Sequence, residues 1–209
     1  MSWVLIIILI FLLPVLYDRL FPFQKPILKD YFIPGRTFTS AAEGVTNTVI
    51  RQEGEKVFCE VSLEPHAAGP PEHFHRTFDE SATVVKGTLT VKAGGQVSTV
   101  NTGERILFKK GVPHTMYNET DSAVIIRSEK DEDHLPVEFA YSLAQLYPLM
   151  QREQKGGLRL FAKMSVLGDL FDTTIQGPPP AVVNFLKNAV RPYARLFGVT
   201  PYDDRSRPH

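Results

Sequence analysis

Short β-rich runs alternate with turn residues over residues 37–129, and this alternation limits the possible folds more than any other feature of the chain. The pairs Lys86-Gly87 and Gly94-Gly95 are turn signals of the kind that hairpins need, because glycine adopts positive φ without strain. No helical period separates the runs, which favours a sandwich or closed barrel over a parallel sheet, and we predict a barrel. The predicted strands cover residues 46–51, 56–63, 81–85, 88–93, 96–101 and 123–128.

Histidines gather inside this region at a spacing typical of a metal site. His73 and His75 are separated by one residue, which on a strand places both imidazoles on the same face. Glu80 follows and could add a carboxylate from the next strand, and His114 comes after a later turn. One histidine alone would indicate only a hydrogen-bonded core or surface residue. The combination indicates a transition-metal site, because imidazole suits Fe, Mn, Ni, Cu and Zn alike.

The spacing of these residues resembles the two motifs of the cupin superfamily. His73-Phe-His75, four residues, Glu80, six residues and Gly87 resemble the first motif. The second motif is similar to a run that begins with Gly103, then has seven residues, a glycine, two residues, His114, three residues and an asparagine. The chain departs from the pattern at two positions that are not ligands. Alanine at position 67 replaces the glycine that opens the first motif, and lysine at position 109 replaces a proline of the second motif.

The resemblance implies a mainly β fold, a cupin-type barrel (double-stranded β-helix or jelly roll) over residues 37–129. It also implies that His73, His75, Glu80 and His114 converge on one divalent transition metal, which could be Fe, Mn, Ni, Cu or Zn. If such a metal is octahedral, four protein ligands leave two positions for water, dioxygen or a chelating substrate.

The first residues predict a membrane segment. Residues 3–17 carry no charge and are dominated by isoleucine and leucine. As a helix they would reach about 22 Å, short of the roughly 30 Å hydrocarbon core, so a longer span requires Asp18 and Arg19 to snorkel. A cleavable signal needs a basic start and small residues at its end, which are missing here. We therefore predict a hydrophobic helix within residues 1–23 that acts as a single-pass anchor.

Basic residues after this segment would leave the folded part cytoplasmic, since Arg19, Lys25 and Lys29 follow the apolar run. The alternative is a helix buried against the barrel, although the apolar residues run continuously rather than at helical spacing.

The period becomes helical in the last part of the chain, which predicts a C-terminal helical extension over residues 135–209. Apolar residues three and four apart indicate helices at 140–152, 157–171 and 181–197. The extension could cover the barrel mouth as a lid or form a homodimer contact. Lys187, Arg191 and Arg195 form a basic stripe, which suits a solvated face or a phosphate-rich membrane surface.

Composition excludes several function classes. Lys plus Arg and Asp plus Glu both number 23, so no overall field attracts nucleic acid, and we expect no nucleic-acid partner. Cys59 is the only cysteine, which rules out an internal disulfide and a cysteine-cluster zinc site. We expect it to be a small buried hydrophobe.

Three functions fit a metal-binding barrel with a small-molecule ligand. A metal-dependent oxidoreductase, dioxygenase-like and acting on a small apolar substrate, fits a ligand set with open positions. A metal-dependent isomerase or epimerase on a sugar or keto acid is the alternative, and it would need an extra general base in the pocket. The third is a non-catalytic cupin that binds a small ligand at a membrane.

Overall fold

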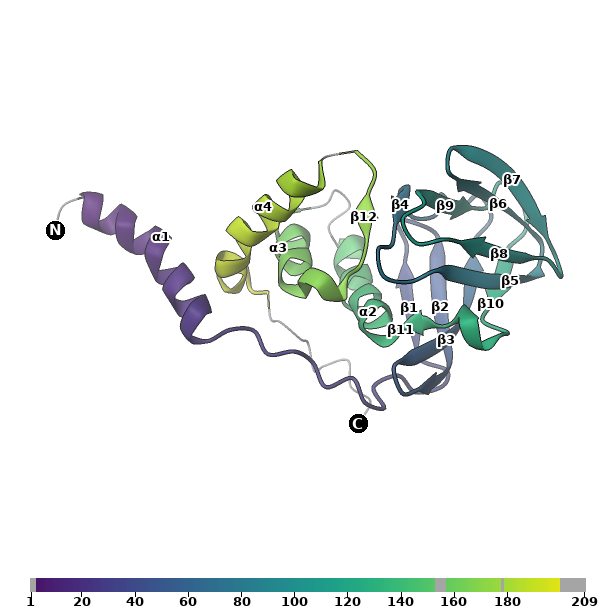
Figure 1. The fold of residues 1–209 in the computed structure, drawn as a ribbon, viewed down its shortest axis with the longest axis horizontal. Helices are drawn as coiled ribbons and strands as arrows, with labels where there is room; N and C mark the ends of the chain where they lie inside the picture. The colour runs from purple at the N-terminus through teal and green to yellow at the C-terminus, as the bar shows by residue number, and fades with distance from the viewer. Residues whose placement is uncertain (1–2, 153–156, 178, 200–209) are drawn as a thin grey trace.

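The computed structural model describes residues 3–152, 157–177 and 179–199, in which two antiparallel sheets lie beside a helical region (Figure 1). The strands are β1 (Thr37–Ser40), β2 (Val45–Glu53), β3 (Lys56–Leu63), β4 (His73–Phe74), β5 (Glu80–Lys86), β6 (Thr88–Ala93), β7 (Gln96–Asn101), β8 (Arg105–Phe108), β9 (His114–Tyr117), β10 (Val124–Arg127), β11 (Leu135–Pro136) and β12 (Thr174–Ile175). The helices are α1 (Trp3–Leu20), η1 (Asp131–Asp133), α2 (Val137–Arg152), α3 (Leu158–Leu167), η2 (Gly168–Leu170), α4 (Pro180–Val190) and η3 (Arg191–Phe197), where η marks a 3-10 helix.

Within the described residues, one sheet has the order β1-β2-β3-β10-β5-β8, with β11 paired to β3. The other has the order β12-β4-β9-β6-β7. Apolar side chains from both sheets, among them Leu63, Val84, Leu89 and Val124, are fully buried in one shared core. The prediction of a mainly β chain is therefore confirmed. The sheets are cupin-like, and strands far apart in the sequence pair within them, as β3 does with β10.

The helical region packs on the β1 and β2 end of the first sheet, where a second core forms. This core joins Phe38 and Val49 of the sheet to Tyr141 of α2 and to Tyr31 in the segment before β1. The C-terminal helical prediction is confirmed for the described residues, although two of the expected helices are shorter. The helix expected over 157–171 is α-helical only as far as Leu167 and is followed by η2. The expected helix over 181–197 is α-helical only as far as Val190 and continues as η3, where proline lacks the N–H that an α-helix interior needs.

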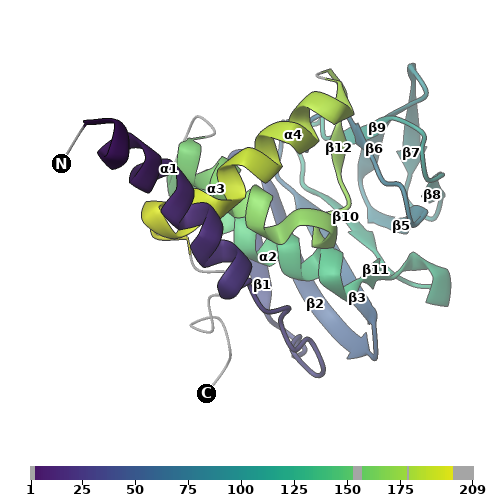
Figure 2. The ribbon, with the colours of Figure 1, turned by 60° about the vertical axis from the view of Figure 1, so that its left-hand side comes forward.

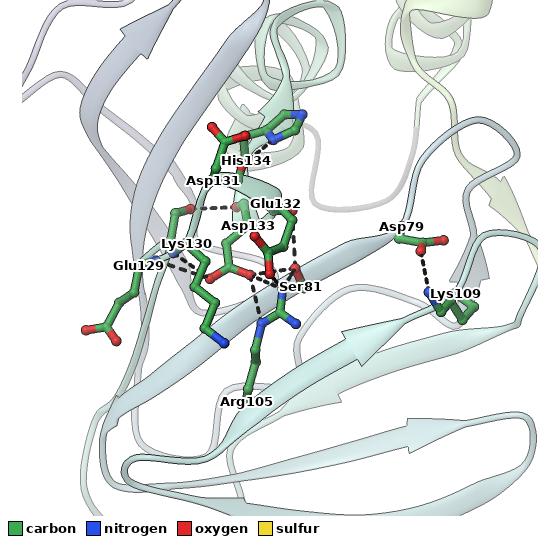
Figure 3. A network of polar contacts seen from close by, with 11 residues as sticks. Asp79, Ser81, Arg105, Lys109, Glu129, Lys130, Asp131, Glu132, Asp133 and His134 are labelled. Atoms are coloured by element: carbon green, nitrogen blue, oxygen red, sulfur yellow. Dashed lines mark hydrogen bonds and ion pairs between the residues drawn. The ribbon is translucent and has the colours of Figure 1, made fainter.

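A buried carboxylate holds the start of the helical region to the first sheet (Figure 3). Asp133 of η1 accepts hydrogen bonds from the Ser81 hydroxyl at 2.6 Å and from Arg105 Nη2 at 2.6 Å. Its other oxygen accepts from the backbone N–H groups of Glu129 and Lys130. Ser81 lies on β5 and Arg105 on β8, so the network fixes the chain just before β11 and α2.

The predicted single-pass anchor over residues 3–17, and the membrane location and orientation drawn from it, are wrong. No helix among the described residues is both long enough and apolar enough to cross a membrane. The helix α1 instead packs against η3 of the helical region (Figure 2). In the last turn of α1, Asp18 forms ion pairs with Arg195 at 3.3 Å and with Arg191 at 3.8 Å. The alternative of a helix buried against the barrel is not observed either, because α1 packs on η3 and leaves Phe11 59% exposed.

Candidate metal centre

The four residues predicted as ligands lie together, on or just after β4 and β9 in the interior of the second sheet and at the start of β5. His73 on β4 pairs directly with His114 on β9, which sets their rings 4.7 Å apart. His75 follows the end of β4, and Glu80 begins β5. One ligand atom from each side chain lies within 4.8 Å of the others. The structure therefore brings all four residues together. Three of them lie on β4, β5 and β9, and His75 lies just after β4.

Each histidine is oriented by a backbone carbonyl. The Nδ1 atoms of His73, His75 and His114 lie 2.8, 2.6 and 2.8 Å from the carbonyl oxygens of Pro71, Asp172 and Val112. A carbonyl oxygen only accepts, so each Nδ1 carries the proton and donates it. In the neutral ring the lone pair is then on Nε2, the atom that faces the cluster.

The Nε2 atoms converge on one carboxylate oxygen. His75 Nε2 and His114 Nε2 each lie 3.1 Å from Glu80 Oε2. Three imidazole lone pairs and a carboxylate facing one another repel unless a cation lies among them, either a proton on Nε2 or a metal ion. The set of three nitrogens and one oxygen matches the ligands that divalent transition metals take. The cluster could therefore hold a metal ion.

The acid and base pKa values shift in the directions that this pairing requires. Burial by itself would raise the pKa of Glu80, but hydrogen bonds from His114 and His75 hold it well below its usual range. Burial by itself would lower the pKa of His75, but the hydrogen bond and charge of Glu80 raise it overall. Burial lowers the pKa of His73. The Glu80 carboxylate is thus anionic. Of His73 and His75, the His75 ring takes up a proton more readily.

Aromatic rings close the cluster from the sides. Phe108 stacks on His114 with 4.3 Å between ring centres, and Phe78 stacks on His75 at 4.3 Å. Phe139 of α2 meets His75 edge-on at 4.9 Å. The side chains of His75 and His114 are each only 1% exposed, whereas that of Glu80 is 17% exposed. The Glu80 carboxylate is therefore more exposed than the rings of His75 and His114.

The C-terminal extension also contributes to the centre, which the sequence did not predict. The strand β12 pairs with β4, opposite Phe74 and His73. Just before β12, the backbone carbonyl of Asp172 accepts a hydrogen bond from His75 Nδ1. The Asp172 carboxylate accepts hydrogen bonds from Arg76 and Thr77. Backbone carbonyls have no residue signature, so no sequence pattern marks this contact.

A cavity of about 100 Å³ adjoins the cluster. His73 and Glu80 form part of its wall, and most of the remainder is apolar. The helix α2 lines it with Phe139, Leu143 and Tyr147. A buried water needs roughly 10–15 Å³, so this cavity has room for a small organic molecule.

Two other residues behave as the sequence predicted or suggested. Cys59 is 2% exposed, and burial raises the pKa of its thiol to about 12, which confirms a small buried hydrophobe rather than a reactive thiol. Asn118, the last position of the second motif, is fully enclosed. Its amide donates to the carbonyls of Glu64 and Ser122, so it fixes the loop after β9 and lies outside the cluster.

The family model of the cupin domain matches residues 59–127, which include all four cluster residues. No curated protein matches the chain.

Similar solved structures cover about half of the chain. A protein from Thermus thermophilus is 18% identical, covers 49% of this chain and 91% of its own, and has a TM-score of 0.39. A cupin-2 domain containing protein from Shewanella frigidimarina is 26% identical, with coverage of 40% and 79% and a TM-score of 0.34. A sugar phosphate isomerase from Silicibacter pomeroyi is 21% identical, with coverage of 51% and 76% and a TM-score of 0.36. The two motifs, the paired sheets and the matching family model identify residues 59–127 of the chain as a cupin domain.

Proposed function

We propose that this protein is a metal-dependent oxidoreductase, dioxygenase-like in its chemistry, that acts on a small apolar substrate at His73, His75, Glu80 and His114. One observation carries the proposal. Three imidazoles, each oriented by a carbonyl at Nδ1, present Nε2 beside a carboxylate in the wall of an apolar cavity. A bound Fe, Mn, Ni, Cu or Zn ion would supply redox or Lewis-acid chemistry at this point.

The residues of the chain would orient the ion and the substrate. The three carbonyls fix the imidazole rings, and the Glu80 carboxylate reduces the net charge of a divalent ion. The stacked rings of Phe78 and Phe108 shield two of the imidazoles from water. The cavity restricts the substrate to a small molecule, and its apolar wall favours a molecule with an apolar body.

The test uses the full chain, purified without metal and loaded with Fe(II) under anaerobic conditions. Oxygen uptake is then followed with a panel of small phenolic and aliphatic substrates, and bound metal is measured by mass spectrometry. His73→Ala combined with His75→Ala is the test variant. His66→Ala combined with His134→Ala is the matched control, because neither His66 nor His134 belongs to the cluster.

We expect about one metal ion per chain and substrate-dependent oxygen uptake in the wild type and the control, with both lost in the test variant. Equal metal content in the two variants would contradict the metal site. Tight metal binding without oxygen uptake across the panel would contradict the oxidoreductase and favour an isomerase or a ligand-binding protein.

A further inference from the structure

The cavity beside the cluster has a second polar corner. It is formed by Asn47 of β2 and Tyr147 of α2, two elements that supply none of the four cluster residues. Asn47 is 4% exposed and Tyr147 is 7% exposed. Most of the remaining wall is apolar and includes Val61, Leu63, Met116, Ile126 and Leu143. A molecule that occupies the cavity therefore meets hydrogen-bonding groups at two places.

The Tyr147 hydroxyl lies within hydrogen-bonding reach of Glu43 and Asn47. Glu43 is itself buried, at 8% exposure, just before β2. Burial first, and then the charge of Glu43, raises the pKa of Tyr147 well above its usual range, so the hydroxyl stays protonated. A phenol that donates to Glu43 and accepts from Asn47 keeps a free lone pair, and the Asn47 amide keeps further donor and acceptor capacity.

Other polar groups in the cavity wall are used by the fold. Among the described lining residues, the Ser81 hydroxyl donates to Asp133, and the Ser128 hydroxyl donates to the Asp133 carbonyl. Arg127 directs its guanidinium to Glu60 on the outer face of the sheet. The corner formed by Asn47 and Tyr147 is therefore the part of the wall, apart from the cluster, that offers hydrogen bonds to a ligand.

Charge restricts what this corner accepts. Glu43 brings a carboxyl group next to the Tyr147 hydroxyl, and the one basic residue among the described lining residues, Arg127, faces outward to Glu60. Burial of an anion here without a cation is strongly unfavourable, whereas a neutral hydroxyl or carbonyl group that forms hydrogen bonds is buried at far lower cost.

We propose that Tyr147 and Asn47 recognise a neutral hydroxyl or carbonyl group at one end of a small ligand whose other end is chelated at the cluster. This inference rests on the proposed function, because it takes the cluster to be metal-loaded. It names the substrate class as a short metal chelator with an apolar middle and a neutral polar end. Tyr147 acts as a specificity-determining residue through its contact with the ligand.

The test compares three five-carbon acids that share a chelating 2-oxo acid head and differ only at the other end. They are 2-oxopentanoate, which ends in a methyl group, 5-hydroxy-2-oxopentanoate, which ends in a hydroxyl, and 2-oxoglutarate, which ends in a carboxylate. Binding to the Mn(II)-loaded full chain is measured by calorimetry. The wild type is compared with Tyr147→Phe and with Tyr141→Phe, the same change on α2 at a buried position outside the cavity wall.

We expect the hydroxyl-ended acid to bind about fivefold more tightly than the methyl-ended acid, and the carboxylate-ended acid to bind most weakly. Tyr147→Phe removes the preference for the hydroxyl-ended acid, while Tyr141→Phe keeps this preference. Equal affinity for the first two acids in the wild type, a preference that survives Tyr147→Phe, or no binding of any of the three would overturn the inference.

Metal content, measured on the same samples, separates the two proposals. A chain that holds no Mn(II) contradicts the proposed function. A loaded chain with no end-group preference contradicts only the recognition by Tyr147 and Asn47.

Discussion

His75 is the cluster residue whose position depends most on distant parts of the chain. Its Nδ1 donates to a carbonyl 97 residues away, and its ring packs against both Phe78 and Phe139. The sequence predicted His75 as a ligand because a residue type and a spacing mark it. The residues that orient it could not be found in the same way, since a carbonyl and two phenylalanines have no specific pattern.

Metal affinity should fall with decreasing pH because of His75. Glu80 raises the His75 pKa above its usual value of 6.5, and the ring must lose its proton before Nε2 can bind a metal. As the pH falls through the His75 pKa, protons compete and affinity drops by up to about tenfold per pH unit. The Glu80 pKa is lowered, so its carboxylate remains ionised over the same range.

The measurement is a Mn(II) titration at several values between roughly pH 8 and pH 6. Glu80→Gln removes the group that raises the His75 pKa, so this variant binds metal more weakly but loses affinity only at lower pH. A wild-type affinity that does not change over this range would contradict the account of His75.

Gly69 is required by both its backbone angle and its surroundings. Its φ is +67°, and a Cβ at this position would lie 1.8 Å from the Met116 carbonyl oxygen on β9. Gly95 has a similar φ of +82° but open space around it. We expect Gly69→Ala to lower the free energy of unfolding by more than roughly 3 kcal/mol, and Gly95→Ala by only about 1 kcal/mol.

Chemical denaturation of both variants checks this difference. Similar losses in the two proteins would show that the close approach of residue 69 to β9 is not what demands glycine there.

At the scale of elements, the segment around Asp172 links the helical region to the cluster. Its carboxylate accepts from the N–H groups of Arg76 and Thr77 and from the Thr77 hydroxyl, directly after His75. Asp172→Ala removes these side-chain hydrogen bonds. The backbone carbonyl of residue 172, which orients His75, is then no longer held in position by them. We expect metal affinity to fall roughly 10- to 100-fold, as for other residues that orient metal ligands.

Asp121→Ala is the control, because Asp121 is 98% exposed and pairs only with the exposed His66 in the described part of the chain. Isothermal titration with Mn(II) compares the two variants. An Asp172→Ala protein that folds and keeps wild-type affinity would exclude a role for the extension at the cluster.

The η1 element depends on one buried carboxylate. The Asp133 side chain is fully buried and shares Arg105 with Glu132, whose side chain is 60% exposed (Figure 3). Asp133→Ala removes the buried acceptor of the 2.6 Å hydrogen bonds from Ser81 and Arg105 and should reduce the free energy of unfolding by roughly 2–4 kcal/mol. Glu132→Ala removes a surface ion pair and should change it by less than about 1 kcal/mol.

Thermal unfolding of the two variants measures this contrast. Equal shifts would mean that burial of Asp133 does not strengthen its contacts.

The elements show which parts of the fold the sequence could predict. Strands such as β3 and β6 were predictable because they contain β-branched residues and begin soon after a glycine. The two-residue strands β4 and β12 carry no alternation to detect, although they place His73 and the extension. The corner formed by Asn47 and Tyr147 was also beyond prediction, because it joins a strand face and a helix face far apart in the chain.

At the scale of the whole molecule, two of the three hydrophobic cores among the described residues contribute to the cavity wall. One lies between the sheets beside the cluster, and the other joins α2 to β1 and β2. The cavity lies where they meet, with lining residues from both sheets and from α2. The expected division into residues 1–23, 37–129 and 135–209 remains a prediction, as do a homodimer and the identity of the metal.

The membrane prediction failed for a physical reason at this scale. Composition reports that residues 3–17 are apolar, but the helix that contains them ends in charged residues paired with η3. A local pattern cannot report such a partner nearly the whole chain away.

The most direct test of the account is a crystal structure of the Mn(II)-loaded full chain with anomalous scattering data. We predict one anomalous peak inside the cluster, about 2.0–2.2 Å from the Nε2 atoms of His73, His75 and His114 and from a Glu80 carboxylate oxygen. A metal-soaked crystal with no peak at these four side chains, or with its peak elsewhere on the chain, would contradict the account.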